Sequence, residues 1–384
     1  MPYLPVKTKV MARILACILI FMATLEICAR IDDTIVYEAP LFGRYDASSL
    51  RILEGDIPRN IPNSRFEKWR NNNLGFRGAD FELRKPIGKT RVVCLGASET
   101  YGLYESSGKE WPAQMQELVP GNAFQVINAS VVGLNLTKYD QYVRKHVLPL
   151  KPDVLVVSVN PFFYAVTQER AAKSNTSKAK HVTKKDDILS TDQIRVLPKL
   201  KQVVKQAAAR TFPDALKRYQ LVKMQEEIKH LETTRLKGKK PRDSVPEIYV
   251  EHFRAELEKF IEFAESHGVK VILLTYPSLI SWRNLNQYPE IFLDSRRFSI
   301  EYSLTGMIDI QDRFNAIIRS SALSHRIGIV DMSAIVPKST EFFGDNVHYT
   351  DRGARTIADH VAQEIVGNAS SSSITGSLNK GDAR

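Results

Sequence analysis

Residues Arg91 to Gly102 read RVVCLGASETYG, and the expectations for the rest of the chain start from this stretch. Its apolar run, Val92 to Leu95, lies between a polar turn-forming segment and Gly96, which predicts a strand buried on both faces. Ser98 then follows the carboxyl end of the strand, the edge at which open parallel α/β sheets bind ligands. Ser98 is a candidate nucleophile, but taken alone it is more simply interpreted as the N-cap of the next helix.

Four more short apolar runs alternate with helical patterns along the chain. The predicted strands after the first are 124–127, 153–159, 269–275 and 327–330, and the predicted helices are 111–119, 137–148, 250–267, 310–321 and 351–366. Alternating strands and helices are typical of a parallel sheet covered by helices on both faces. We therefore predict an α/β fold, a three-layer αβα sandwich with about five parallel strands, over residues 89–366.

The amino-terminal segment is apolar and follows basic residues. Residues 10–28 read VMARILACILIFMATLEIC, with an uninterrupted apolar run from Ile14 to Leu25. This pattern predicts a transmembrane signal anchor over 10–28, with residues 1–9 in the cytoplasm and the rest exported. The predicted location is the cell inner membrane, with a periplasmic or extracellular domain. A cleaved signal peptide remains an alternative, although no small-x-small cleavage site follows.

Three further segments differ from the α/β pattern. Residues 29–88 are rich in proline and turn formers and are predicted to be a juxtamembrane connector, while the Ser/Gly/Asn-rich residues 367–384 are predicted to be a disordered tail. Residues 166–243 hold 20 lysines and arginines against 9 acids, a difference of +11 that equals the formal net charge of the whole chain. Helical spacing over 200–209 and 215–236 predicts a two-helix basic insertion, whose exposed face is either merely solvated or binds anionic lipid or an acidic polymer.

The composition limits the remaining function classes. The three cysteines, Cys17, Cys28 and Cys94, form neither a disulfide framework nor a zinc-binding spacing. No metal site and no cofactor is expected. Nucleic-acid binding, suggested by the basic charge, is not expected either, because the chain is predicted to be exported and contains no nucleic-acid-binding module.

One histidine has an acid in the relation that proton transfer requires. Residues 342–353 read FFGDNVHYTDRG, so that Asp345 precedes His348 by three residues in a loop before the last predicted helix. A carboxylate beside a histidine fixes the imidazole tautomer and stabilises the imidazolium. Such a loop can direct both groups toward the sheet edge that carries Ser98.

Four blocks of the chain together resemble the SGNH, or GDSL-type, hydrolase superfamily. They are Gly96-Ala97-Ser98-Glu99, Gly133 at the end of the run from Ile127, Asn160 in Ser158-Val159-Asn160-Pro161, and Asp345-Asn346-Val347-His348. The chain departs from the family pattern where Ala97 replaces Asp, where Glu99 replaces Leu, and in the third block, which lacks the usual Gly and the Asp after Asn. The resemblance implies a flavodoxin-like α/β fold and a serine esterase.

The resemblance also implies a role for each block. Ser98 would be the nucleophile, His348 its base, and Asp345 the group that orients the histidine. The backbone N–H groups of Ser98 and Gly133 and the side-chain amide of Asn160 would form the oxyanion hole.

Three functions from different classes follow. The first is a membrane-anchored esterase that removes O-acyl groups, most plainly O-acetyl groups, from a carbohydrate or another ester substrate outside the cytoplasm. The second is an O-acyltransferase that acts on an exported polysaccharide with the same triad. The third is a non-catalytic binding or scaffold module, for which the departures in the first and third blocks argue and the retained Ser98, His348 and Asp345 do not.

Overall fold

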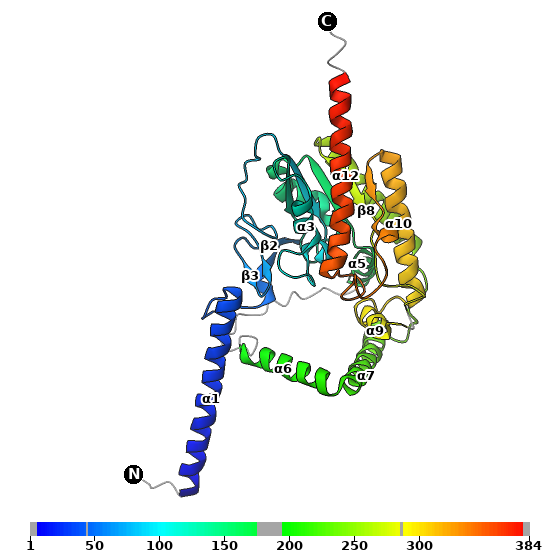
Figure 1. Cartoon of the computed structure of the whole chain (residues 1–384). Coiled ribbons are helices and arrows are strands. Elements are labelled where there is room, and N and C mark those ends of the chain that lie inside the picture. Colours follow the sequence, from blue (N-terminus) through cyan, green and yellow to red (C-terminus); the bar gives the residue numbers. More distant parts are fainter. Residues whose placement is uncertain (1–5, 44, 175–193, 285–286, 379–384) are drawn as a thin grey trace.

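The computed structural model describes residues 6–43, 45–174, 194–284 and 287–378 (Figure 1). Its centre is a five-stranded sheet in the order β6-β5-β7-β8-β9, in which every pair is parallel. The strands are β5 (Thr90–Leu95), β6 (Phe124–Asn128), β7 (Val154–Ser158), β8 (Lys270–Leu274) and β9 (Gly328–Val330). The order 2-1-3-4-5 is the flavodoxin-like order of doubly wound sheets, so the predicted fold class is confirmed.

Alternate residues of each strand face opposite helix layers, as the pleat of a strand requires. Val93, Leu95, Leu155 and Leu273 pack against one layer, which contains α4 (Tyr139–Tyr142), α5 (Pro161–Ser174), α8 (Glu247–Ser266) and α10 (Leu304–His325). Val92, Cys94, Val156 and Ile272 pack against the other layer, formed mainly by α3 (Trp111–Leu118) and α12 (Asp351–Leu378). The sheet is thus buried on both faces, which explains its continuous apolar strands.

Smaller elements complete the layers. Residues 137–148, predicted as one helix, instead belong to a broken series over residues 136–150: η2 (Leu136–Lys138), α4, the π-helical η3 (Val143–Val147) and η4 (Leu148–Leu150). Pro149 lacks a backbone donor and limits regular helix at its end. Four α-helices of the described residues were not predicted: α5 and the shorter α2 (Ser98–Tyr101), α9 (Pro289–Phe298) and α11 (Met332–Ile335).

The first helix is longer than its predicted span. Helix α1 (Val6–Tyr37) continues nine residues past Cys28, so the predicted connector begins within a helix. Over Lys9–Tyr37 it is long and apolar enough to cross a membrane, with a mean hydropathy of 2.2 in its most apolar window. Figure 1 shows it standing away from the sheet and its covering helices.

The remainder of the connector is an ordered part of the domain. It contains η1 (Ala47–Leu50) and two antiparallel hairpins, β1 (Arg51–Glu54) with β2 (Ile57–Asn60), and β3 (Arg65–Phe66) with β4 (Trp69–Arg70). Phe76 is buried in the core, and the backbone N–H of Arg77 donates to the Asn128 carbonyl at the end of β6. The absence of hydrophobic periodicity concealed these hairpins, because each strand is only two to four residues long.

The predicted basic insertion is helical but begins later than residue 166. Val166 lies in the middle of α5, a layer helix, whereas the excursion consists of α6 (Val196–Thr211) and α7 (Pro213–Leu231), followed by the π-helical η6 (Glu232–Leu236). Residues 175–193 of the insertion lie outside the described residues. In Figure 1 the two helices form an arm that runs from α9 to α1.

The predicted disordered tail also differs, because α12 extends through Leu378. Residues 367–378 are therefore helical, and residues 379–384 lie outside the described part of the chain. Serine and glycine lower helix propensity, but they add only about 0.5–1 kcal/mol each against a helix that is already nucleated.

Arg77 lies in a buried ionic contact between the connector and the domain. Its Nη2 atom is 3.6 Å from Glu110 Oε2, with both side chains 2% exposed, and its Nε donates to the Tyr101 carbonyl at 3.3 Å. Its guanidinium also lies over the Tyr101 ring. Arg77 therefore supports α2, the short helix that begins at Ser98.

We predict that Arg77→Ala lowers the free energy of unfolding by about 3–5 kcal/mol, because it leaves Glu110 charged, buried and unpaired. The control is Arg59→Ala, whose partner Glu54 is half-exposed and 3.7 Å away, and which should cost less than about 1 kcal/mol. Thermal unfolding of the detergent-solubilised chain measures both. Equal effects of the two substitutions would contradict the prediction.

Candidate active site

Ser98 lies where the backbone turns from β5 into α2. Gly96 must be glycine at this turn, because a Cβ there would lie 2.2 Å from Thr100 Oγ1. Ser98 is the first residue of α2, and Ala97 precedes it with φ −102° and ψ −137°. The tight turn directs the serine to the carboxyl edge of the sheet.

His348 and Asp345 meet Ser98 at this edge. The His348 Nε2 atom is 2.8 Å from Ser98 Oγ, and Nδ1 is 2.7 Å from Asp345 Oδ2. The other oxygen of Asp345 accepts the backbone N–H groups of Val347, at 2.8 Å, and of His348, at 2.7 Å. The loop thus closes on its own carboxylate and fixes the separation between acid and histidine.

The protonation of this group follows from the surroundings of Asp345. Burial alone would raise the pKa of Asp345, but the hydrogen bonds and positive charge of His348 and two backbone N–H groups outweigh burial and lower the pKa. An ionised carboxylate can only accept, so Nδ1 of His348 carries the proton and Nε2 is left to accept the hydrogen of the Ser98 hydroxyl. The geometry therefore permits Ser98 to lose its proton to His348.

Asn160 and Gly133 follow the two strands that neighbour β5. Asn160 comes after β7; its Nδ2 donates to the Tyr276 hydroxyl at 2.7 Å, and its Oδ1 accepts the Phe163 N–H at the start of α5. One hydrogen of the amide remains for another acceptor. Gly133 comes after β6 with φ +86°, a conformation that favours glycine.

The connector contacts the loop that contains Gly133. The Arg51 guanidinium donates to the Val132 carbonyl, and the Asn60 amide donates to the Ser130 carbonyl at 3.1 Å. The loop is also joined to the first block, because the Val131 N–H donates to the Gly96 carbonyl at 3.2 Å. The β1–β2 hairpin thus helps to shape one side of the candidate site.

Glu99, the residue that departs from the family pattern, is completely buried beneath Ser98. Its Oε1 accepts the Ala97 N–H at 3.0 Å. Burial raises its pKa, and hydrogen bonds from the Glu99 and Ala97 N–H groups, the charge of His348 and the Asn160 amide offset this only in part. A buried carboxyl group, held toward its neutral form, therefore follows Ser98 in the chain and contacts the Asn160 amide.

Tyr104 is a contact of the histidine that the sequence did not suggest. Its ring stacks on the His348 ring with centroids 5.2 Å apart and planes 9° apart, and half of the residue is exposed. A Cβ at Gly344 would lie 2.4 Å from the Tyr104 ring, so this glycine admits the tyrosine. Lys68 of the β3–β4 turn donates to the Tyr104 carbonyl at 2.8 Å. The sole sequence signal was Gly344 in the histidine block, which is compatible with close packing but does not identify the partner.

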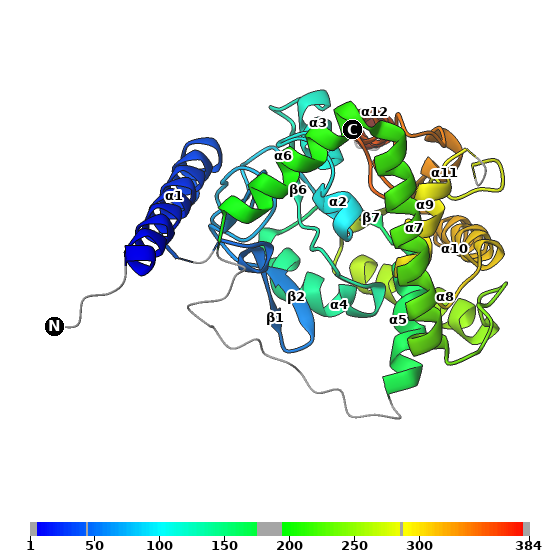
Figure 2. The ribbon, with the colours of Figure 1, turned by 90° about the horizontal axis from the view of Figure 1, so that it is seen from below.

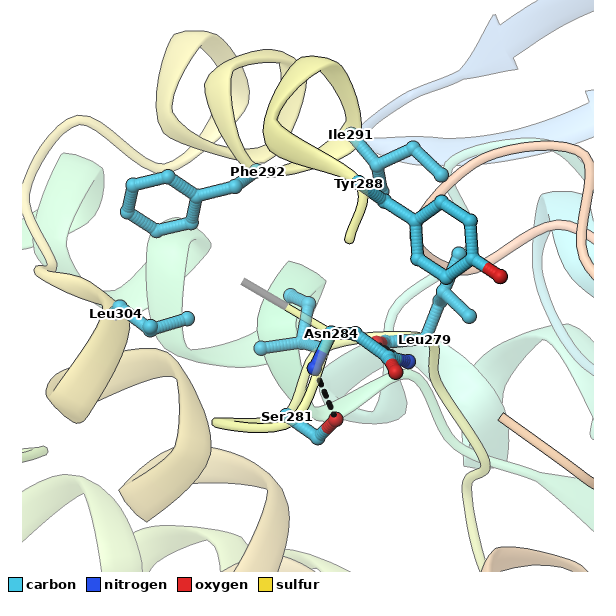
Figure 3. Close-up of a pocket in the computed structure, with 8 residues that line it drawn as sticks. Leu279, Ser281, Asn284, Tyr288, Ile291, Phe292 and Leu304 are labelled. Carbon is cyan, nitrogen blue, oxygen red and sulfur yellow. Dashed lines mark hydrogen bonds between the residues drawn. The ribbon is translucent and has the colours of Figure 1, made fainter. Parts of the chain in front are cut away.

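A small apolar pocket lies beside the histidine loop. It lies between residues 279–284 and α9 and is lined by Leu279, Ile280, Ser281, Asn284, Tyr288, Ile291, Phe292 and Leu304 (Figure 3). Its volume is about 20 Å³, and the Leu279 N–H donates to the carbonyl of Asn346, between Asp345 and His348. None of the triad residues lines this pocket. Its contact with the candidate site is the hydrogen bond between Leu279 and the histidine loop.

Comparison with known proteins identifies likenesses among solved structures. No protein-family model matches the chain, and no curated protein sequence matches it. A lipase/acylhydrolase from Enterococcus faecalis is 17% identical, with 73% of this chain and 97% of that one covered and a TM-score of 0.41. An acetylxylan esterase from Geobacillus stearothermophilus is 14% identical, with 73% and 96% covered and a TM-score of 0.40.

A third likeness is to a GDSL-like lipase from Bacteroides thetaiotaomicron, which is 15% identical over 74% of this chain and 92% of that one, with a TM-score of 0.39. At these scores the likeness is loose. The fold of this chain rests on its own strand order and register.

Glu105, next to Tyr104, is a buried carboxyl group near the site. Burial raises its pKa to about 8; Glu110 also raises it, while backbone N–H groups of Glu105 and Tyr104 and the charge of Lys68 lower it. In the unfolded chain the carboxyl loses its proton near 4.5. Between these two values the unfolded chain binds fewer protons than the folded one, so the contribution of Glu105 destabilises the fold increasingly as pH rises.

We therefore predict that Glu105→Gln raises Tm over the wild type by more at pH 8 than at pH 5. An amide cannot ionise, and the penalty of burying the charge disappears with it. Glu251→Gln, on the exposed face of α8, is the matched control and should give the same Tm difference at both pH values. If the Tm gain of Glu105→Gln does not change with pH, Glu105 is not the buried proton-binding group described here.

Proposed function

We propose that the chain is a membrane-anchored serine ester hydrolase of the SGNH type. The observation that supports this most is the unbroken series of short contacts from Ser98 Oγ through His348 to the Asp345 carboxylate. Hydroxyl, imidazole and carboxylate in this order are the minimum set for nucleophilic attack by a serine at neutral pH. A scaffold module has no need of this geometry.

The proposed reaction has two steps. In the first, Ser98 Oγ attacks the ester carbonyl while His348 Nε2 takes its proton, and the same proton then passes to the departing alcohol. In the second, water attacks the acyl-serine with His348 again as base, releasing the acid and restoring Ser98. Asp345 holds the imidazole in the correct tautomer and stabilises its charged form throughout.

The oxyanion of each tetrahedral intermediate would be held by the backbone N–H groups of Ser98 and Gly133 and by the Asn160 amide. The Asn160–Tyr276 hydrogen bond supports this role, because it occupies one amide hydrogen and fixes the direction of the other. The second amide hydrogen contacts Glu99, and because this carboxyl group is held toward its neutral form, it would release that hydrogen to the oxyanion.

The proposed substrate is an O-acyl ester outside the cytoplasm, with an O-acetyl group on a carbohydrate as the first candidate. The acetylxylan esterase from Geobacillus stearothermophilus has such a substrate in its name, which describes that protein alone. The exposed Tyr104 ring beside His348 gives a sugar a surface on which to pack. An acyltransferase with the same triad differs only in the acceptor of the second step, so assays with and without a sugar acceptor separate the two.

The triad prediction concerns turnover of a small acetyl ester. Ser98→Ala, His348→Ala and the double variant should lose activity to a similar degree, because the effects of a triad are not additive. Asp345→Asn should also be severe, since it favours the wrong tautomer. Asn160→Ala should lower kcat by about 10²–10³ with little change in KM, because it acts on the oxyanion.

Two controls accompany the triad variants. His252→Ala removes an exposed histidine on α8 and should leave turnover unchanged. Wild-type activity should fall at acid pH, because an imidazolium cannot accept a proton. A folded Ser98→Ala variant with wild-type turnover would rule out Ser98 as the nucleophile.

The topology prediction is that α1 spans the inner membrane with the amino terminus in the cytoplasm. Lys7, Lys9 and Arg13 precede the apolar run and favour this orientation. Alkaline phosphatase fused after Lys89 should be active, and β-galactosidase at the same junction should be inactive. The reverse pattern would place the domain in the cytoplasm.

A further inference from the structure

We infer that α6 is an interfacial helix that lies on the outer surface of the bilayer crossed by α1. The partner is the lipid surface itself, contacted by the exposed apolar face of α6. The inference rests on the proposed membrane anchorage of α1 and adds a second, separate contact with the membrane.

The first observation is that α1 fixes the start of α6 where its apolar run ends. Leu25 is the last residue of that run, and Glu26 follows it. The Glu26 carboxylate accepts the backbone N–H groups of Arg195, at 3.2 Å, and of Val196, at 3.0 Å. These are donors that the first turn of α6 leaves unsatisfied. An anionic side chain of α1 therefore caps α6 directly above the apolar run.

Ion pairs also join α1 to the first turn of α6. Lys199 Nζ is 2.7 Å from Asp33 Oδ1 and also contacts Asp32, and Arg195 lies 3.7 Å from Asp33. Asp33 is 8% exposed, so this is a packed contact and not a loose surface pair. Together, the cap and the ion pairs fix the position of the start of α6 along α1.

The second observation is the apolar face of α6. At about 100° per residue, the side chains of Leu197, Val203 and Val204 lie within about 60° of Leu200. Their exposed fractions run from 46% to 60%, so neither the domain nor α7 covers this face. Such an uncovered apolar stripe is unusual on a face in contact with water.

The charges of α6 flank this stripe. Lys201, Lys205 and Arg210 lie about 80–140° from Leu200, on both sides of it, and α6 contains no acid, while Lys199 pairs with Asp32 and Asp33 of α1. An apolar stripe with flanking lysines and no acid is the pattern of helices that lie in the headgroup region, where long basic side chains reach the phosphates. α6 contains four of the 20 lysines and arginines of residues 166–243 and none of the nine acids, so its own charge favours anionic headgroups.

The third observation is the orientation of the arm. Figure 1 shows α6 running across the direction of α1 rather than along it, as a helix in the plane of a bilayer must. The amino-terminal end of α12, next to His348, points toward the arm, and Figure 2 views α2 from the side on which α6 and α7 lie. A bilayer contact through α6 would therefore present the catalytic edge of the sheet to the membrane surface.

A second copy of the chain and a soluble acidic polymer are the other occupants to consider. Continuity favours the bilayer, because the uninterrupted apolar run of α1 ends next to Glu26, the residue that caps α6. Lipid that surrounds α1 is then already adjacent to the exposed stripe, with no further partner required.

The test uses the full chain in vesicles of phosphatidylethanolamine and phosphatidylglycerol. Exposed Cys17 and Cys28 are replaced by alanine, and buried Cys94 is retained. An environment-sensitive fluorophore is then attached to Leu200→Cys, to Val204→Cys, or to Gln202→Cys, which lies on the opposite face about 160° from Leu200. Lipids carrying a quencher near the headgroup report contact with the bilayer.

We expect the probes at 200 and 204 to shift to the blue and to be quenched severalfold more than the probe at 202. In detergent-free vesicles, equal and weak quenching at all three positions would overturn the inference. Disulfide-linked dimers through residue 200 would also overturn it, by assigning the face to a second copy. Flotation of the protein with the vesicles reports the anchorage of α1 separately, and hydrolysis of a soluble ester reports the catalytic proposal.

Discussion

The hydrogen bond between His348 Nε2 and Ser98 Oγ connects two residues that are 250 positions apart in the chain. It can form because β5 lies between β6 and β7 in a sheet whose strands all run parallel, so that the loop after β5 opens on the same edge as the segment after β9 that contains His348. A slip of one residue in any strand would turn its apolar side chains to the wrong layer. The sheet register thus brings the parts of the candidate site together, and local interactions hold the loops that carry them.

Those local interactions come largely from the segment between α1 and the sheet. Arg77 supports α2 from below, Arg51 and Asn60 hold the loop of Gly133, and Lys68 holds the backbone of Tyr104. The connector is therefore part of the wall of the candidate site as well as the link between α1 and the sheet. The same segment continues from α1, whose end is joined to β3 by the contact of Glu38 with Arg65. This segment thus joins α1 to the residues around the candidate site.

The sequence was sufficient to predict the parts of the molecule that depend on regular patterns. Buried parallel strands are continuous apolar runs, and the spacing of Asp345 and His348 is local, so both could be recognised along the chain. The hairpins of the connector and the stacking of Tyr104 on His348 could not, because short strands have no periodicity and a stacking partner is chosen by tertiary packing. The extension of α1 to Tyr37 was missed because its last turns are polar, although Glu26, Asp32 and Asp33 find partners on α6.

The central claim is that Ser98 is a nucleophile made reactive by His348 and Asp345. Labelling of the full chain with a fluorophosphonate, followed by peptide mass spectrometry, tests it most directly, because the reagent reports the activated hydroxyl without knowledge of the substrate. The account predicts one modified peptide, containing Ser98, whose labelling is lost in His348→Ala and strongly slowed in Asp345→Asn. Modification of a different serine, or unchanged labelling of Ser98 without His348, would contradict it.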